Sequence, residues 1–177
     1  IYVAVRNETW ATAPFELSAL RVDAKSDEFT ASFTADHRDG PLHFRWRAEI
    51  TGDAHGTIRF HMDGEALSTF RRNRIGICVL HPIDGLAGQP CRIERIDASV
   101  LEGVFPSLIA PHQPFLDIRE ISYEVGPGVR AAVRLEGDTF EMEDQRNWTD
   151  ASFKTYSTPL SLARPVEVTT GTRIIQT

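Results

Sequence analysis

The sequence predicts an all-β protein built as an antiparallel β-sandwich, and three observations support this prediction. Apolar and polar residues alternate with a period of two in many short runs, which is typical of strands with one buried face. Turn signals such as Asp39-Gly40 and Gly126-Pro127-Gly128 separate these runs. No long stretch follows the i, i+3, i+4, i+7 spacing of a helix.

Nine runs are expected to form strands. The clearest of them is 42–50, in which Leu42 and Phe44 face one way while His43 and Arg45 face the other. In chain order the nine runs cover residues 1–5, 28–36, 42–50, 56–64, 75–82, 91–99, 117–125, 129–138 and 140–144.

The other segments are explained by their composition. The longest apolar run, IGICVL at 75–80, has the length of a buried strand and is far shorter than the roughly 18 residues of a membrane-spanning helix. Three prolines within 104–116 exclude a regular central strand, so an ordered loop is expected there. Two short stretches, 65–70 and 149–156, allow a helical turn.

Length favours one domain. A chain of 177 residues can bury one sizeable core and is short for two, and no linker or repeat divides it. We therefore expect a single sandwich domain over residues 1–177. Because the chain opens on Ile1 inside a predicted strand and stops abruptly at Thr177, we expect it to be cut from a larger protein.

Charge and cysteine content exclude several classes. A net charge of −6 and an isoelectric point near 5.5 argue against a nucleic-acid partner, which requires clustered Lys and Arg. The two cysteines, Cys78 and Cys91, form no CxxC pair, so a reducing, cytoplasmic location is expected, with Cys78 as a buried hydrophobe. The six histidines lack HxH and HExxH spacing, and nucleotide-binding glycine motifs are absent, so neither metal nor cofactor is expected.

The segment FEMEDQRNWTDASFKTYSTPL, residues 140–160, has the strongest functional signal. In an extended strand Glu141 and Glu143 share a face, roughly 7 Å apart, and shielding could raise the pKa of one carboxyl. Arg146 and Lys154 could stabilise a negative oxygen.

The same segment contains groups suited to holding a sugar. Asn147 and Asp150 could bond hydroxyls, and Trp148 could stack on the apolar face of a sugar ring. The alternative is a solvated strand face whose charges form surface ion pairs, although such a face has no need of interleaved aromatic residues.

Two further groups of residues complete the candidate set. Arg74 precedes the buried strand at 75–80 and His81 follows it, where a histidine could serve as an acid or base. His112 lies between two prolines in the loop at 104–116. For each histidine the alternative is a purely structural hydrogen-bonding role.

NRIGICVLHP (73–82) together with the 140–160 segment resembles the N-terminal β-rich domain of the D-apionate lactonase family. IYVAVRNETW (1–10) and FPSLIAPHQPF (105–115) fit the same family pattern, so the resemblance spans nearly the whole chain. It implies that the chain is the N-terminal domain of a bacterial enzyme that hydrolyses D-apionolactone in carbohydrate catabolism. A looser similarity, at the level of fold, is to the supersandwich of galactose mutarotase-like proteins.

Lactone hydrolysis needs an activated water, an oxyanion donor and a proton for the ring oxygen. We expect Glu143 to act as base, Arg146 or Lys154 to bind the oxyanion, and His81 to supply the proton, at a site where these segments converge. The remaining candidates are expected to bind substrate: Glu141, Asn147, Trp148, Asp150, Arg74 and His112.

The expected partners are a small sugar lactone or another carbohydrate and other domains of the same protein, with no nucleic acid and no membrane. The main alternative function is a non-catalytic carbohydrate-binding or scaffolding sandwich attached to a catalytic barrel.

Overall fold

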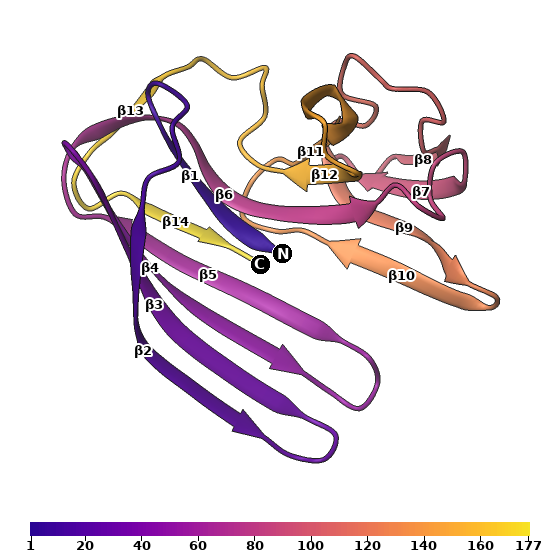
Figure 1. Cartoon of the computed structure of the whole chain (residues 1–177), viewed down its shortest axis with the longest axis horizontal. Helices are drawn as coiled ribbons and strands as arrows, with labels where there is room; N and C mark the ends of the chain where they lie inside the picture. The colour runs from indigo at the N-terminus through magenta and orange to yellow at the C-terminus, as the bar shows by residue number, and fades with distance from the viewer. The chain divides into compact units, whose positions relative to one another are not determined.

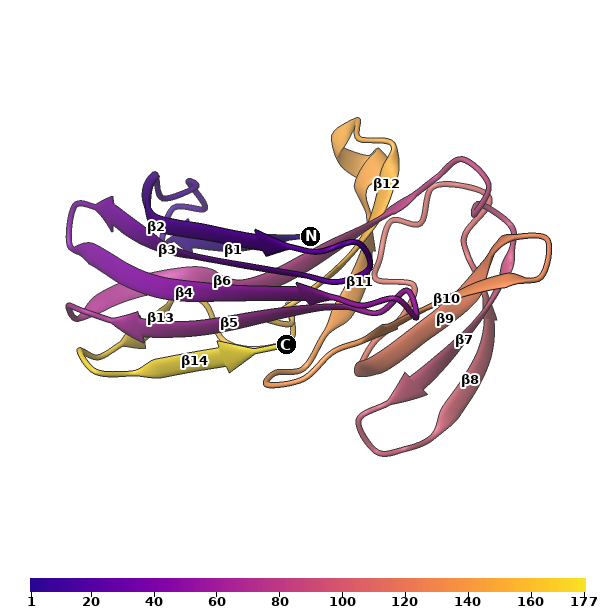
Figure 2. The ribbon, with the colours of Figure 1, turned by 90° about the horizontal axis from the view of Figure 1, so that it is seen from below.

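The computed structural model describes residues 1–177, and antiparallel strands account for almost all of its regular structure (Figures 1 and 2). The one helix is a 3₁₀ turn, η1 (Gln145–Trp148). The strands are β1 (Tyr2–Asn7), β2 (Phe15–Ala24), β3 (Phe29–Asp39), β4 (Leu42–Gly52), β5 (Ile58–Ala66), β6 (Phe70–Pro82), β7 (Pro90–Arg95), β8 (Val100–Val104), β9 (Ile118–Gly126), β10 (Val129–Arg134), β11 (Glu141–Asp144), β12 (Ser152–Tyr156), β13 (Val166–Val168) and β14 (Arg173–Gln176).

These strands form three sheets with antiparallel pairing. The first has the order β1-β6-β12-β11, and β13 also pairs with β6. The second has the order β10-β9-β7-β8, and the third β14-β5-β4-β3-β2. The predicted all-β antiparallel sandwich is therefore confirmed, as is the loop between β8 and β9.

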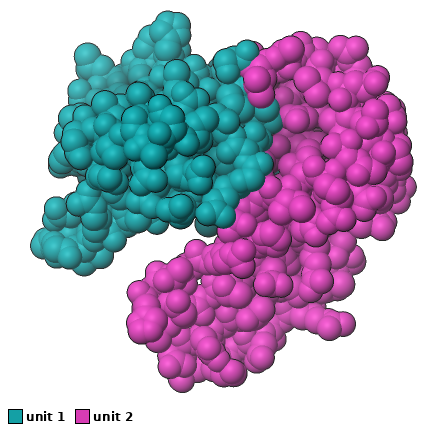
Figure 3. Space-filling view, turned by 180° about the vertical axis from the view of Figure 1, so that it is seen from behind, with its two compact units in different colours: residues 1–3, 77–161 teal, residues 4–76, 162–177 magenta.

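The chain groups into two compact units, which Figure 3 shows in two colours. Unit 1 comprises Ile1–Val3 and Ile77–Ser161, and unit 2 comprises Ala4–Gly76 and Leu162–Thr177. Each unit is described by itself below. The single domain expected over residues 1–177 stays a prediction.

Unit 2 is organised around the inner face of the third sheet, β14-β5-β4-β3-β2. Phe44, Trp46 and Met62 are buried on this face, as the alternation in the sequence predicts. The buried His37 links the sheet to the segment before β2: its Nδ1 lies 3.1 Å from the Ala13 carbonyl oxygen, and its Nε2 accepts a hydrogen bond from Trp46. Burial lowers the pKa of His37, so the ring is a neutral part of the core.

Two glycines of the third sheet lie under aromatic rings of a neighbouring strand, where a larger residue would collide with the ring. A Cβ atom on Gly64 would lie 2.3 Å from the ring of Phe44, and one on Gly52 would lie 2.2 Å from the ring of Phe29. Phe44 is fully buried and cannot move aside, whereas Phe29 lies at an exposed hairpin end.

Alanine at Gly64 should therefore destabilise the chain by about 1–3 kcal/mol, as overpacking in a core does. Alanine at Gly52 should cost less than about 1 kcal/mol, because the exposed Phe29 can swing away. Urea unfolding of both variants checks this. Equal losses at the two positions would contradict the assignment of Phe44 to the core.

Unit 1 has its core between the second sheet and the β6-β12-β11 part of the first. Phe105 is fully buried there, with its ring centroid 5.1 Å from that of Phe153 on β12 and 5.3 Å from that of Tyr123 on β9. The two layers therefore meet through aromatic contacts, and His81 on β6 packs into the same cluster. Cys78 is buried, as expected, and forms no disulfide.

Candidate functional site

The candidate site is the polar face of the hairpin formed by β11 and β12. The register pairs Glu141 with Tyr156 and Glu143 with Lys154, so these four side chains lie on one face of the hairpin. Gln145, the first residue of η1, extends the row. We call these five residues the β11–β12 polar face.

Glu141 and Tyr156 form the inner end of this face. The Tyr156 hydroxyl donates to Glu141 Oε1 at 2.5 Å, and the backbone N–H of Leu160 donates to the same oxygen at 2.8 Å. Gln113, from the loop before β9, lies with its Nε2 3.4 Å from the Tyr156 hydroxyl. Both Glu141 and Tyr156 are buried, so this carboxylate is held in one position and shielded from water.

Lys154 and Glu143 form the outer end. The Lys154 ammonium makes an ion pair with Glu143 and donates a hydrogen bond to Gln145 Oε1 at 3.2 Å. It also lies 5.5 Å from the centre of the Tyr156 ring. The side chain of Glu143 is 16% exposed and that of Lys154 is 8% exposed. Of the two carboxylates, Glu143 is therefore the one that water or a ligand can reach.

Arg146 and Asn147, by contrast, are used to hold a loop. Arg146 makes a bidentate pair with the buried Asp144, through Nε at 2.9 Å and Nη2 at 2.6 Å. Its other side-chain hydrogen bonds go to the backbone carbonyl oxygens of Pro106, Ser107 and Leu108, and its guanidinium lies 5.3 Å from the ring centre of Phe153. Asn147 donates to the carbonyl oxygen of Ala110 at 2.7 Å. The Arg146 guanidinium is therefore engaged with the loop, whereas the Lys154 ammonium lies on the polar face beside Glu143.

Asp144 is the anchor of this arrangement. Burial alone would raise its pKa, but hydrogen bonds from Arg146 and from the backbone N–H of Ala110 keep the pKa of Asp144 below its usual value. The same pairing raises the pKa of Arg146. Asp144 is thus a structural group that is charged at neutral pH.

The structure does not bring His81 to Glu143. His81 pairs in register with Phe153, so it lies on the opposite face of the sheet from Lys154 and Glu143. It is fully buried, with Nδ1 2.8 Å from the Tyr123 hydroxyl and Nε2 2.9 Å from Thr155 Oγ1. His81 was expected to lie beside Glu143, and the structure differs because alternation along β6 directs the His81 side chain into the core.

The environment of His81 predicts a pH-dependent stability. Burial lowers the pKa of His81 to about 4, against about 6.5 for an exposed histidine. Between these two values the unfolded chain binds more protons, so stability falls as the pH drops through this range. Lowering the pH from 7.5 to 5.0 should remove about 2 kcal/mol through this residue.

Urea unfolding at both pH values, for the wild type and for His81→Gln, checks this prediction. The variant should be less stable at pH 7.5 and should lose distinctly less on acidification. Phe105→Leu is a control, because it perturbs the same core without removing a titrating group. An unchanged pH dependence in His81→Gln would show that His81 does not titrate as proposed.

The other candidate residues are dispersed. Arg74 belongs to unit 2, where its guanidinium lies 5.6 Å from the ring centre of Trp10. His112, Trp148 and Asp150 belong to unit 1 and are exposed, and Asp150 accepts a hydrogen bond from Ser152. The polar face therefore unites only Glu141, Glu143 and Lys154 from the predicted set.

Comparison with known proteins adds the decisive observation. All 177 residues match the family model described as the N-terminal domain of D-apionate lactonase. The chain belongs to this family. It is also 42% identical, over 166 residues, to a D-apionate lactonase from Brucella anthropi. That alignment covers 93% of this chain but only 27% of the relative, so the chain spans about a quarter of the relative's length.

No solved structure matches the chain, so the looser similarity to galactose mutarotase-like proteins stays a prediction. The structure contains no helix with the length and apolar character needed to span a bilayer. No three His, Cys, Asp or Glu side chains are grouped so that they could hold a metal ion.

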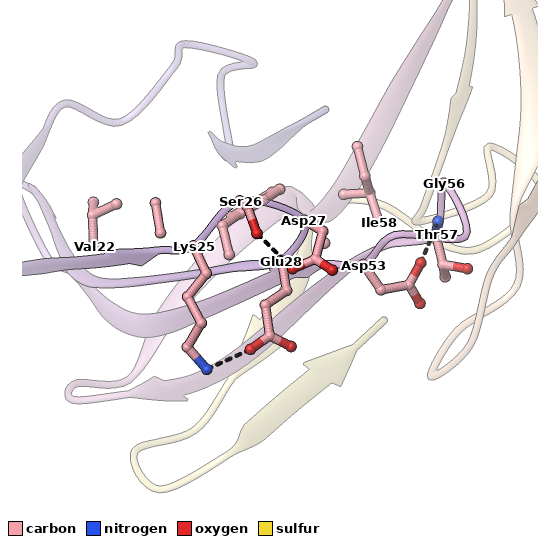
Figure 4. Close-up of a pocket in the computed structure, with 12 residues that line it drawn as sticks. Val22, Lys25, Ser26, Asp27, Glu28, Asp53, Gly56, Thr57 and Ile58 are labelled. Carbon is pink, nitrogen blue, oxygen red and sulfur yellow. Dashed lines mark hydrogen bonds and ion pairs between the residues drawn. The ribbon is translucent and has the colours of Figure 1, made fainter.

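A hollow of about 560 Å³ lies elsewhere on this family member, in unit 2, between the β2–β3 and β4–β5 turns (Figure 4). Its apolar wall includes Val22, Phe29 and Ile58. Its charged groups are engaged within their own turns: Lys25 pairs with Glu28, and Asp53 accepts hydrogen bonds from the N–H groups of His55 and Thr57. None of the predicted site residues lines this hollow.

Two residues of the polar face, Tyr156 and Gln145, and the neighbouring Gln113 are absent from the predicted set. Tyr156 follows Lys154 by two positions, which is the signal that would place both on one strand face. Gln145 is recognisable as the next member of the Glu141, Glu143 series. Gln113 has no such signal, because it reaches the site through the fold of the loop.

Proposed function

We propose that this chain is the N-terminal domain of a sugar-lactone hydrolase that opens the lactone of D-apionate, and that the β11–β12 polar face takes part in the reaction. The observation that supports the activity is the 42% identity to a D-apionate lactonase over 93% of this chain. Among the predicted site residues, Glu143 and Lys154 are the acid and base groups in direct contact.

Glu143 is proposed to activate the water. With the lactone bound, its carboxylate removes a proton while the water oxygen attacks the carbonyl carbon, which gives a tetrahedral intermediate. The partial exposure of Glu143 admits that water, whereas Glu141 is closed off by Tyr156 and Leu160.

Lys154 is proposed to stabilise the negative oxygen of this intermediate. Its ammonium is nearly buried, so its field acts where water screens it little. When the ring C–O bond breaks, the proton held by Glu143 passes to the departing alkoxide oxygen. One carboxylate thus serves as base and then as acid, and no role remains for His81.

Glu141, Tyr156 and Gln145 are proposed as positioning residues. Gln145 fixes the Lys154 ammonium through its carbonyl oxygen, and the Tyr156 ring flanks the same group. The substrate contacts expected from Asp150, Arg74 and His112 stay predictions, and nothing in their surroundings directs them to Glu143.

Release of acid from the lactone, followed by pH titration, tests the proposed function. It is measured for the intact gene product that contains this chain and, in parallel, for residues 1–177. Hydrolysis by both supports the assignment of the chemistry to this chain. If the intact product hydrolyses the lactone and residues 1–177 do not, the rest of that product is required for activity. No hydrolysis of this lactone or of other sugar lactones by either protein would overturn the proposal.

A further inference from the structure

The loop between β8 and β9 exposes large apolar side chains to solvent although it is held firmly. Leu108 is 84% exposed and Ile109 is 54% exposed. Trp148, in the adjacent η1 turn, is 73% exposed. Arg146 and Asn147 bond the η1 turn directly to the backbone of residues 106–110, so Trp148 is held next to the loop. We call Leu108, Ile109 and Trp148 the apolar knob.

The backbone beneath the knob is fixed along its length. Arg146 bonds the carbonyl oxygens on both sides of Ser107, and that of Ser107 itself. Asp144 accepts from the N–H of Ala110 at 2.9 Å, and Asn147 donates to the carbonyl oxygen of the same residue. Prolines at 106, 111 and 114 remove further freedom from this segment.

Such an arrangement is costly for a surface loop. Burying Asp144 and ordering the loop both oppose folding, and the result presents apolar side chains to water. A loop that is already ordered loses little entropy when it binds a partner, so this geometry favours association. A largely exposed tryptophan held on an ordered backbone is also typical of the residues that contribute most to a protein interface.

The knob is poorly suited to a sugar. A sugar site needs free hydrogen-bonding side chains around an aromatic ring. Here the amide of Asn147, next to Trp148, donates to the Ala110 carbonyl oxygen, and the Asp144 carboxylate is bound by Arg146. The predicted sugar contact of Trp148 is therefore less well supported than a protein contact.

We infer that the apolar knob is a docking surface for the part of the same polypeptide that lies outside residues 1–177. The Brucella anthropi relative has nearly three quarters of its length beyond the region that this chain matches. A covalently connected partner is present at high effective concentration, so a surface of modest area suffices to hold it. The inference depends on family membership and not on the lactone chemistry.

Hydroxyl-radical footprinting of the intact gene product, read by mass spectrometry, tests this inference. Val125 and Val129 serve as internal controls, because they are 55% and 58% exposed in the same unit. Relative to their intrinsic reactivities, Leu108, Ile109 and Trp148 should be oxidised at least about fivefold more slowly than the two valines, as expected where an interface excludes water.

Oxidation of the knob at the rate of the controls would overturn the inference. Protection that appears only as protein concentration rises would identify a second copy as the partner, and protection that requires added lactone or sugar acid would identify a ligand site. Either result also overturns it. Since the footprint involves no turnover, failure here leaves the proposed lactonase activity to be judged by its own assay.

Discussion

Replacing Arg146 with alanine is expected to destabilise the chain by about 3–5 kcal/mol, the usual cost of leaving one partner of a buried ion pair alone. The side chain of Asp144 has no exposed surface, and it would keep only the backbone hydrogen bonds from Arg146 and Ala110. The carbonyl oxygens of Pro106, Ser107 and Leu108 would lose their donor at the same time. Urea unfolding at neutral pH measures the loss.

Two further variants make this prediction specific. Arg146→Lys keeps the positive charge but lacks the planar guanidinium that bonds Asp144 and the loop carbonyl oxygens at once. Its stability should therefore lie between those of the wild type and Arg146→Ala. Arg134→Ala removes an exposed ion pair with Glu120 and Glu136 and should cost less than about 1 kcal/mol. If Arg146→Ala is as stable as the wild type, the loop does not depend on the hydrogen bonds of Arg146.

Replacing Lys154 with methionine is expected to lower kcat for lactone hydrolysis by about 10²–10³, which is typical for loss of one oxyanion donor. The change should fall mainly on kcat, because the ammonium is proposed to act on charge that develops in the transition state. KM should change by less than about tenfold. Steady-state kinetics of the intact gene product with the lactone of D-apionate gives both constants.

Lys154→Arg is the matched variant for this experiment. It retains a positive charge beside Glu143, although a guanidinium cannot occupy the ammonium position against Gln145 and Tyr156 without displacement. Part of the rate should survive in Lys154→Arg and almost none in Lys154→Met. If both variants keep the wild-type kcat and fold normally, Lys154 is not the oxyanion donor.

Much of the fold could be predicted because alternation is a local property. Each of the nine predicted runs overlaps a strand, among them β4, where the alternating pattern places Phe44 and Trp46 in the core. β2 was missed for a physical reason. All its residues are exposed, and its pairing with β3 shifts register between Ser18 and Arg21, so no single alternation runs through it.

The helical turns allowed at 65–70 and 149–156 were wrong. β5 continues to Ala66 and β6 begins at Phe70, while Ser152–Tyr156 form β12. The strand β12 is hard to recognise because all five of its residues are buried and include Lys154, whose charge is compensated by Glu143. Such compensation depends on pairing between strands, which composition does not reveal.

The placement of the candidate residues could be predicted in part for the same reason. The shared face of Glu141 and Glu143 follows from alternation within one strand. The separation of His81 from that face depends on the register between β6 and β12, and the use of Arg146 depends on the path of a loop some forty residues earlier. The 140–160 segment is rich in charged and amide side chains for two reasons. Glu141, Glu143 and Lys154 form the polar face that is proposed to take part in the reaction, whereas Arg146 and Asn147 anchor the loop at residues 106–110.

The central claim is tested most directly by kcat/KM of Glu143→Gln in the intact gene product, with Glu102→Gln as the control at an exposed position of the same unit. The account predicts a fall of about 10²–10⁴ for Glu143→Gln, as expected on removal of a general base, and no change for the control. Retention of the wild-type kcat/KM by a folded Glu143→Gln protein would contradict it. The reaction would then occur elsewhere in the protein, and this domain would have an accessory role.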